Sequence, residues 1–327
     1  MNYLSVFSGI EAASVAWGGL GFKPVGFSEI DPFSCAVLSY RFPGVKNYGD
    51  INNFKEWKID EPIRIVVGGS PCQSYSIAGY RRGIEDVRGK LMLTYGNMVG
   101  YFKPLWVVWE NVPGVLSTNG GRDFAEFLIM LEKCGYGIAW RVLDAQFFGV
   151  PQCRRRVFVI GNFGNVQCAA AVLFDSGSMQ KHIKTRQQGG RQATRGIAGG
   201  IGAQGVIALL DQGGNFMQVQ HEKTGTILAS EAAHPVIIFY HDKKQNEIIL
   251  RHLTPLEDER LQGFPDDWTK VPFNGKPLEK CPDRLRYKAI GNSMAVPVMR
   301  WIGERISKVE KLFSNTIVTP KAGGGTR

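Results

Sequence analysis

Over the first 165 residues, short apolar runs alternate with helix-length segments whose apolar positions recur every three or four residues. The short runs predict β-strands, because they are rich in Val, Ile and aromatic residues and are bounded by Gly, Pro or Asp. Strands are expected at 3–7, 24–28, 63–67, 106–109 and 157–160. Helices are expected between them, at 11–20, 32–41, 91–101 and 123–133. This alternation predicts an α/β fold with a doubly wound, mostly parallel sheet.

Local signals mark two helix starts. Asp31 precedes Pro32, the arrangement of an N-cap followed by a proline in the first turn. Thr254 and Glu257 have the spacing of a capping box, in which each side chain accepts from the other residue's backbone amide. A last long helix is expected over 293–309.

The pattern changes after the fifth predicted strand. Ten glycines lie between positions 189 and 225, and the regular alternation is lost. Apolar runs at 206–210 and 236–240 predict strands, so we expect a second, smaller β-rich domain, with a disordered linker as the alternative. The predicted division assigns 1–165 and 287–327 to the first domain and 166–286 to the second.

Positive charge is concentrated in one segment. The chain has 39 Lys and Arg against 29 Asp and Glu, a formal charge of +10. Residues 151–200 contribute +7 of this, from eight basic side chains and one Asp. Such a one-sided segment favours a partner that carries phosphates over a merely solvated surface.

Neither a membrane anchor nor a secretory leader is expected. No stretch approaches the roughly 18 charge-free apolar residues of a spanning helix, and the first residues lack a basic region. The six cysteines include no C-x-x-C pair and are too sparse for a disulfide scaffold, and the five histidines include no H-x-x-x-H pair. We therefore expect a chain that begins at Met1, lies in the reducing cytoplasm and holds no metal.

Polar residues follow the predicted strands, where ligands bind in an open α/β sheet. Strand 3–7 runs into a small-residue turn, Phe7-Ser8-Gly9, whose amides suit an anionic group. Glu29 and Asp31 follow the second strand and suit ribose hydroxyls, although Asp31 also suits helix capping. Asp50 and Ile51 could meet the edge and the face of an adenine, or form a simple turn.

Cys72 is the most distinctive residue at these strand ends. It follows the strand 63–67 in a Gly/Pro/Ser loop and precedes three arginines, Arg81, Arg82 and Arg88, a setting that favours the thiolate. Glu110 ends the strand 106–109 and lies at the same rim of the predicted sheet. The pair indicates a nucleophile with a neighbouring acid.

These residues together resemble the DNA (cytosine-5) methyltransferase family. The resemblance spans nearly the whole chain and rests on the order of eight short motifs, which are Phe7-Ser8-Gly9, Glu29 with Asp31, Gly49-Asp50-Ile51, Pro71-Cys72-Gln73, Glu110-Asn111-Val112, Gln152 to Arg156, Arg251 to Pro265 and Gly291-Asn292-Ser293. The Asp/Asn-Pro-Pro-Tyr/Phe loop of amino-directed methyltransferases is absent. One motif departs from the family, since Ser5 stands where an acid is usual and Glu11-Ala12-Ala13 replaces a Gly-rich run.

The resemblance implies a catalytic role for five residues. Cys72 would attack carbon 6 of a cytosine, and Glu110 would hydrogen-bond ring nitrogen 3 and the exocyclic amine. Asn111 would fix the loop that carries Glu110. Arg156 and Arg154 would approach the base oxygen and nearby phosphates, whereas Arg155 would point to the other face of its strand.

The resemblance also implies S-adenosylmethionine as cofactor. Phe7 would stack on the adenine, Glu29 would bind the ribose and Asp50 the adenine amine, while Gly9 would allow close approach of the backbone. Asn292 and Ser293 would face the methionine end. The remaining expected cofactor contacts are Ser8, Asp31, Ile51 and Pro71.

Double-stranded DNA is the implied partner, with the target base flipped out of the helix. The expected DNA contacts are Gln73, Ser76, Arg81, Arg82, Arg88, Lys181, Lys184, Arg186, Arg191 and Arg195. We expect a monomer, and a cognate restriction endonuclease could accompany it. The sequence does not determine which bases are read.

Three alternatives remain open. An RNA-directed enzyme is disfavoured because the variable region lacks a Cys-Phe-Thr tripeptide. A non-catalytic DNA-binding homologue would not need the thiol of Cys72. A nicotinamide dehydrogenase is disfavoured because no G-x-G-x-x-G follows the first strand.

Overall fold

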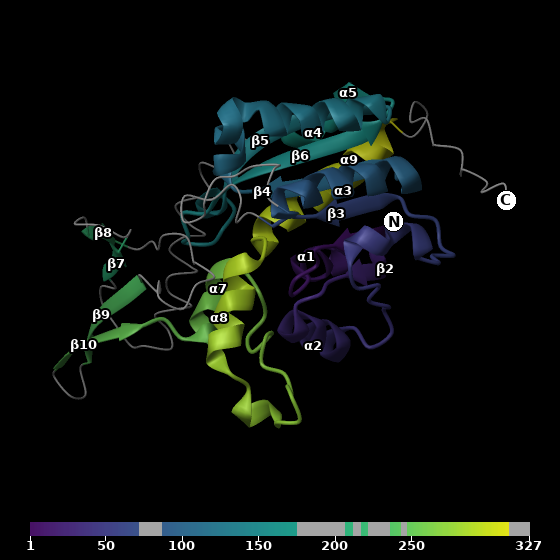
Figure 1. Ribbon diagram of the computed structural model, residues 1–327. Coiled ribbons are helices and arrows are strands. Elements are labelled where there is room, and N and C mark those ends of the chain that lie inside the picture. Colours follow the sequence, from purple (N-terminus) through teal and green to yellow (C-terminus); the bar gives the residue numbers. More distant parts are fainter. Residues whose placement is uncertain (72–86, 175–206, 212–216, 222–235, 243–246, 314–327) are drawn as a thin grey trace.

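The computed structural model describes residues 1–71, 87–174, 207–211, 217–221, 236–242 and 247–313 (Figure 1). Among these, six strands form one sheet in the order β2-β1-β3-β4-β6-β5. The strands are β1 (Asn2–Val6), β2 (Lys23–Ser28), β3 (Ile65–Gly68), β4 (Trp106–Asn111), β5 (Tyr136–Asp144) and β6 (Arg155–Phe163). The first four run parallel, while β6 is antiparallel to both of its neighbours, β4 and β5. The predicted mostly parallel α/β sheet is therefore confirmed.

Helices pack on both faces of this sheet because alternate strand residues point to opposite sides. On one face, Tyr3, Ile65 and Trp106 belong to a core with α1 (Ala12–Trp17), α5 (Val166–Leu173) and α9 (Val296–Phe313). On the other face, Leu4 and Val66 belong to a core with α3 (Val87–Phe102) and α4 (Arg122–Lys133). The parallel strands are thus buried on both sides, which explains their continuous apolar runs.

The remaining elements connect these layers. The helix α2 (Pro32–Arg41) follows β2, and α7 (Pro255–Gln262) and α8 (Asp283–Asn292) precede α9. Short 3₁₀ helices are η1 (Gly18–Leu20), η2 (Ile51–Glu56), η4 (Pro113–Leu116), η5 (Thr118–Gly121), η6 (Ala145–Phe147) and η7 (Leu278–Lys280). Both predicted caps are confirmed, because Asp31 accepts from the amide of Ser34 and Thr254 forms a complete capping box with Glu257.

A second sheet contains four antiparallel strands in the order β10-β9-β7-β8. They are β7 (Ile207–Asp211), β8 (Met217–His221), β9 (Val236–Asp242) and β10 (Glu247–His252). The strands expected at 206–210 and 236–240 are therefore confirmed. In Figure 1, α7 and α8 lie between this sheet and the larger one.

The structure differs from the expected elements at three places. The strand β5 was not expected, because its sequence mixes Gly, Arg and Asp with apolar residues, as suits an edge strand. The helix α5 was not among the expected helices, and it packs on β5, β6 and α9. The last helix begins at Val296 instead of Ser293, since Ser293 is extended and caps α8.

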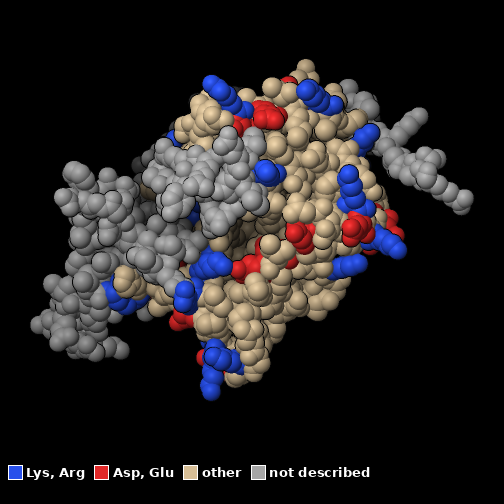
Figure 2. Space-filling view, in the orientation of Figure 1, with Lys and Arg blue, Asp and Glu red and all other residues tan. Residues whose placement is uncertain are grey.

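Charged side chains are mixed in sign over the described surface in the view of Figure 2. The basic excess predicted for 151–200 falls largely on residues outside those the structure describes. Among the described residues, no helix combines the length and the apolar character needed to cross a bilayer.

Candidate active site

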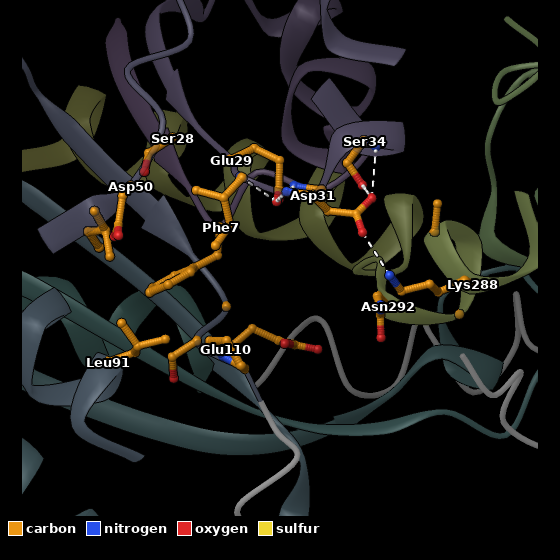
Figure 3. A pocket seen from close by; sticks show the side chains of 18 of the residues that line it. Phe7, Ser28, Glu29, Asp31, Ser34, Asp50, Leu91, Glu110, Lys288 and Asn292 are labelled. Atoms are coloured by element: carbon orange, nitrogen blue, oxygen red, sulfur yellow. Dashed lines mark hydrogen bonds and ion pairs between the residues drawn. The ribbon is translucent and has the colours of Figure 1, made fainter. Parts of the chain in front are cut away.

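A cavity of about 530 Å³ lies at the carboxyl ends of the parallel strands (Figure 3). Figure 3 shows Asp50 and Ser28 toward one end of it and Lys288 and Asn292 toward the other, with Phe7 between them. Its lining includes the expected residues Phe7, Gly9, Glu29, Asp31, Asp50, Ile51, Pro71, Glu110, Arg154, Arg156 and Asn292. The fold thus brings together motifs that are dispersed along the sequence.

The turn after β1 is held tightly against β2. Phe7 and Gly9 both have left-handed backbone conformations, with φ of 50° and 56°. At Gly9 this conformation costs little free energy because glycine has no Cβ. The amide of Ser8 donates to the carbonyl of Ser28 at 3.2 Å, and the amide of Ser28 donates to Ser8 Oγ at 3.2 Å. These bonds fix the turn so that Phe7 faces the cavity, whereas Ser8 serves the turn itself.

Glu29 is held by backbone amides. Its Oε2 accepts from Gly9 at 2.7 Å, and its Oε1 accepts from Ile30 and Asp31 at 2.8 Å each. The carboxylate is therefore fixed between the two βα turns, at the wall of the cavity.

Asp31 caps α2 and also pairs across the cavity mouth. It accepts from the amide of Ser34 at 3.1 Å and from Lys288 Nζ at 2.7 Å. Burial favours a higher pKa for Asp31, but the hydrogen bonds from Lys288 and Ser34 outweigh it, and the net pKa is lowered. Lys288 was not among the expected site residues, although its i,i+4 spacing from Asn292 places both on one face of α8.

The segment that contains Asp50 and Ile51 supplies an acid beside an apolar side chain. Asp50 caps η2 by accepting from the amide of Asn52 at 2.9 Å. Ile51 is buried behind it, and both residues line the cavity with Leu91 of α3. Leu91 was not expected, because nothing in a helical pattern distinguishes a wall residue from a core residue.

Glu110 is the acid at the end of β4, and it is only 9% exposed. Its Oε1 lies 3.1 Å from Nε of Arg156, which belongs to the neighbouring strand β6. Burial raises the pKa of Glu110, and the positive charges of Arg156 and Arg154 only partly oppose the rise. The side chain therefore retains a proton to higher pH than an ordinary carboxyl does.

Asn111 ties the end of β4 to the loop after β3. Its Nδ2 donates to Ser70 O at 3.2 Å and to Ser70 Oγ at 3.0 Å, and its Oδ1 accepts from the amide of Val112 at 2.8 Å. Trp109 Nε1 also donates to Ser70 Oγ, at 3.2 Å. Ser70 was not predicted, yet these bonds fix the backbone two residues before Cys72.

Gly69 is another residue that the sequence analysis did not single out. A Cβ at this position would lie 2.9 Å from Glu110 Oε2 and 3.2 Å from Met294 Cε. Glycine therefore lets the backbone after β3 pass directly against the Glu110 carboxyl.

Arg154, which was expected to approach the base, lines the cavity and is also tied to the backbone at the end of α8. It is only 2% exposed, and its Nη2 donates to the carbonyls of Gly291 and Ser293 at 2.9 and 2.7 Å. Arg154 therefore braces the α8–α9 junction, because those carbonyls are left over at the end of α8.

That junction places two further expected residues. Asn292 is exposed and lines the cavity. Ser293 is buried and donates from Oγ to the carbonyl of Met294 at 3.2 Å. It lines a smaller adjoining cavity instead of the main one.

The remaining expected site residues lie outside the part of the chain that the structure describes. These are Cys72, Gln73, Ser76, Arg81, Arg82, Lys181, Lys184, Arg186, Arg191 and Arg195, together with the side chain of Arg88. Within the described ranges, no group of three or more His, Cys, Asp or Glu is placed to hold a metal ion.

Comparison with known proteins gives a consistent relationship. The model of the family described as C-5 cytosine-specific DNA methylase matches residues 1–194 and 173–308. The Type II methyltransferase M2.BsuMI of Bacillus subtilis (strain 168) is 30% identical over 320 residues, which cover 96% of this chain and 77% of that protein. A protein of Escherichia phage P1 named DNA N-6-adenine-methyltransferase is 31% identical over 462 aligned residues, which cover 94% of this chain. The chain spans only 61% of that phage protein's length.

The fold has relatives among solved structures. The Entamoeba histolytica methyltransferase EhMeth superposes with a TM-score of 0.65 and 16% identity, over 94% of this chain and 98% of that one. At 16% identity, this similarity shows that the two proteins share a fold.

Proposed function

Because the chain belongs to the C-5 cytosine-specific DNA methylase family, we propose that it methylates carbon 5 of cytosine in double-stranded DNA. The observation that carries this proposal is the buried Glu110 carboxyl. It contacts Arg156 and lies against the loop that leads through Ser70 and Pro71 to Cys72. An acid with a raised pKa against the loop that leads to a cysteine suits chemistry on a pyrimidine ring.

The cavity fits S-adenosylmethionine as the methyl donor. Its volume of about 530 Å³ lies within the range typical of small-molecule sites. Phe7 and Ile51 offer apolar surface for an adenine, Glu29 offers a fixed carboxylate for ribose hydroxyls, and Asp50 offers an acceptor for the adenine amine. When bound, the cofactor supplies an electrophilic methyl group on a sulfonium.

The protein's own residues perform the remaining chemistry. The Cys72 thiolate adds to carbon 6 of the cytosine, which makes carbon 5 nucleophilic. Glu110 donates its proton toward ring nitrogen 3, and Arg156 stabilises the charge that develops around the base. After methylation, the proton on carbon 5 passes to solvent, the bond between Cys72 and carbon 6 breaks, and ring nitrogen 3 returns its proton to Glu110, which restores the thiolate, the acid and the aromatic ring.

Cytosine is favoured over adenine as the target. The phage P1 relative carries an adenine-directed name, but this sequence has no Asp/Asn-Pro-Pro-Tyr/Phe loop. The family match, the Pro71-Cys72-Gln73 motif and the Glu110–Arg156 pair all point to the ring carbon. The target base must leave the helix to reach such a cavity, and the small sheet β7–β10 and the basic segment that precedes it in the sequence are proposed to bind the DNA.

A covalent trap tests the proposal. Duplex DNA that contains 5-fluorocytosine at its target sites, incubated with S-adenosylmethionine and the full chain, should form a complex that survives denaturing electrophoresis. The fluorine cannot leave as a proton does, so Cys72 stays attached to carbon 6. Cys72→Ala should form none, while Cys134→Ala, in the cap that ends α4 and outside the cavity lining, should form as much as the wild type.

The substrate class is tested in the same way. Trapping on tRNA but not on duplex DNA would favour the RNA-directed alternative. Tight DNA binding without trapping or methyl incorporation would favour a non-catalytic binding protein.

A further inference from the structure

Glu11 is a buried carboxyl that the proposed mechanism does not use. It precedes α1 with a left-handed backbone (φ 64°) and is 1% exposed. Its Oε2 accepts from Ser5 Oγ at 2.7 Å, and its Oε1 accepts from the amide and the hydroxyl of Ser14 at 3.0 Å each. Ser5 and Glu11 both belong to the one motif that departs from the family pattern, and in the fold they are in direct contact.

Glu11 faces a small cavity that adjoins the main one. This cavity has a volume of about 40 Å³, which is enough for one group of the size of a water molecule or an ammonium ion. Phe7, Gly9, Gly69, Glu110 and Asn292 line both cavities. The smaller cavity is therefore a side chamber at the end of the main one where α8 gives way to α9.

The charges around this chamber are one-sided. Among the described residues, its lining includes two carboxyls, Glu11 and Glu110, and neither Lys nor Arg. Glu110 has Arg156 as its partner, whereas Glu11 accepts hydrogen bonds from two hydroxyls and one amide. A carboxylate has about four acceptor positions, so Oε2 retains one after its bond with Ser5. A buried carboxylate whose partners are neutral favours a cationic ligand.

We propose that Glu11 is a cofactor-binding residue whose carboxylate receives the ammonium group of the methionine end of S-adenosylmethionine. This inference rests on the proposed function and adds a contact that no expected motif residue supplies. In this arrangement Ser5 positions the carboxylate, and the hydroxyl and amide of Ser14 hold its other oxygen.

The contact makes cofactor binding depend on pH. Burial raises the pKa of Glu11 to about 7, although the hydrogen bonds from Ser5 and Ser14 lower it in part. Among the described residues, the other titratable groups that face it are Tyr3 from β1, whose pKa burial raises, and Glu110 from β4. Below pH 7 Glu11 is protonated in the free protein, so the cofactor must displace a proton and its affinity should fall by up to about tenfold per pH unit.

Calorimetric titration of the full chain with three ligands tests the proposal. S-adenosylmethionine and S-adenosylhomocysteine carry the ammonium group, and methylthioadenosine lacks it. Glu11→Gln should weaken the first two by about 10- to 100-fold, the range for a hydrogen bond between charged groups, and leave methylthioadenosine unchanged. It should also abolish the pH dependence near 7.

Three results with Glu11→Gln would overturn the proposal. Equal weakening for all three ligands would indicate a merely structural role for Glu11, and weakening for S-adenosylmethionine alone would assign the sulfonium as its partner instead. Unchanged binding would remove Glu11 from the site. Failure of the wild type to bind S-adenosylmethionine would contradict the proposed function itself.

A second variant covers the case in which Glu11→Gln does not fold. Ser5→Ala removes a bond that lowers the pKa of Glu11, so the loss of affinity for S-adenosylmethionine should begin at higher pH than in the wild type. An unshifted pH profile in Ser5→Ala would contradict the proposal.

Discussion

Glu110, at the end of β4, and Glu11, at the N-cap of α1, are two buried carboxyls beside the same side chamber, yet their surroundings differ. Glu110 has a guanidinium 3.1 Å away, whereas Glu11 has neutral donors at 2.7 to 3.0 Å. Burial raises the pKa of both. The comparison teaches that similar burial can serve two purposes, because the partner decides whether the carboxyl is already compensated or is still open to a cation.

The largest expected effect is on catalysis at Glu110. Glu110→Gln keeps the shape of the side chain but cannot titrate, so the single-turnover rate of methyl transfer should fall by about 10²- to 10³-fold. The affinity for the methyl donor should stay within about threefold of the wild type, because the proposed donor contacts lie elsewhere. A rate close to that of the wild type would remove Glu110 from the mechanism.

The second effect is on the stability of the free protein, and it concerns Glu11. Its pKa is about 7 in the fold, against an ordinary value of 4.5, so between these values the folded protein holds more protons than the unfolded chain. Stability should therefore decline as the pH rises from 4.5 to 7, by roughly 3 kcal/mol at most, since each pKa unit is worth about 1.4 kcal/mol.

Urea unfolding of the wild type and Glu11→Gln between pH 4.5 and about pH 8 measures this decline. Asp258, 2% exposed, adds a similar trend because burial and then the charges of Glu257 and Glu259 raise its pKa to about 8. Only the difference in the free energy of unfolding between the wild type and Glu11→Gln isolates the contribution of Glu11. Parallel stability curves would contradict this, because they would show that the pKa of Glu11 is the same in the folded protein and in the unfolded chain.

The smallest expected effect concerns Arg156, the charged partner that Glu110 has and Glu11 lacks. Arg156 lowers the pKa of Glu110 against the effect of burial, so Arg156→Gln should raise it further. The pH at which Glu110 loses its proton in the rate profile should rise by about one unit, a typical effect of one neighbouring charge. Arg156→Lys, which keeps the charge, is the control and should shift the profile less.

Much of the site could be predicted from local patterns. The strand ends after β1, β2 and β4 were recognisable, because each is a buried apolar run followed at once by a polar residue, and the carboxyl ends of parallel strands share one edge of the sheet. Phe7, Glu29, Asp50 and Glu110 line one cavity for this reason.

Other contacts have no signal within a sequence window. Arg154 reaches the carbonyls of Gly291 and Ser293, 137 and 139 residues away. Lys288 pairs with Asp31 across 257 residues. The antiparallel direction of β6 was also hidden, since apolar content shows that a strand is buried but not which way it runs.

By itself, the sequence determined the alternation of strands and helices, the caps of α2 and α7, and the set of polar residues at the sheet's carboxyl edge, since periodicity and capping are local properties of the chain. Only the tertiary structure decided which of those residues meet, which of them brace the backbone, and that Ser5 and Glu11 form one hydrogen-bonded pair. The reason is physical: burial, pKa and the presence of a counter-charge belong to the space around a side chain, and that space is enclosed by segments far apart in the sequence.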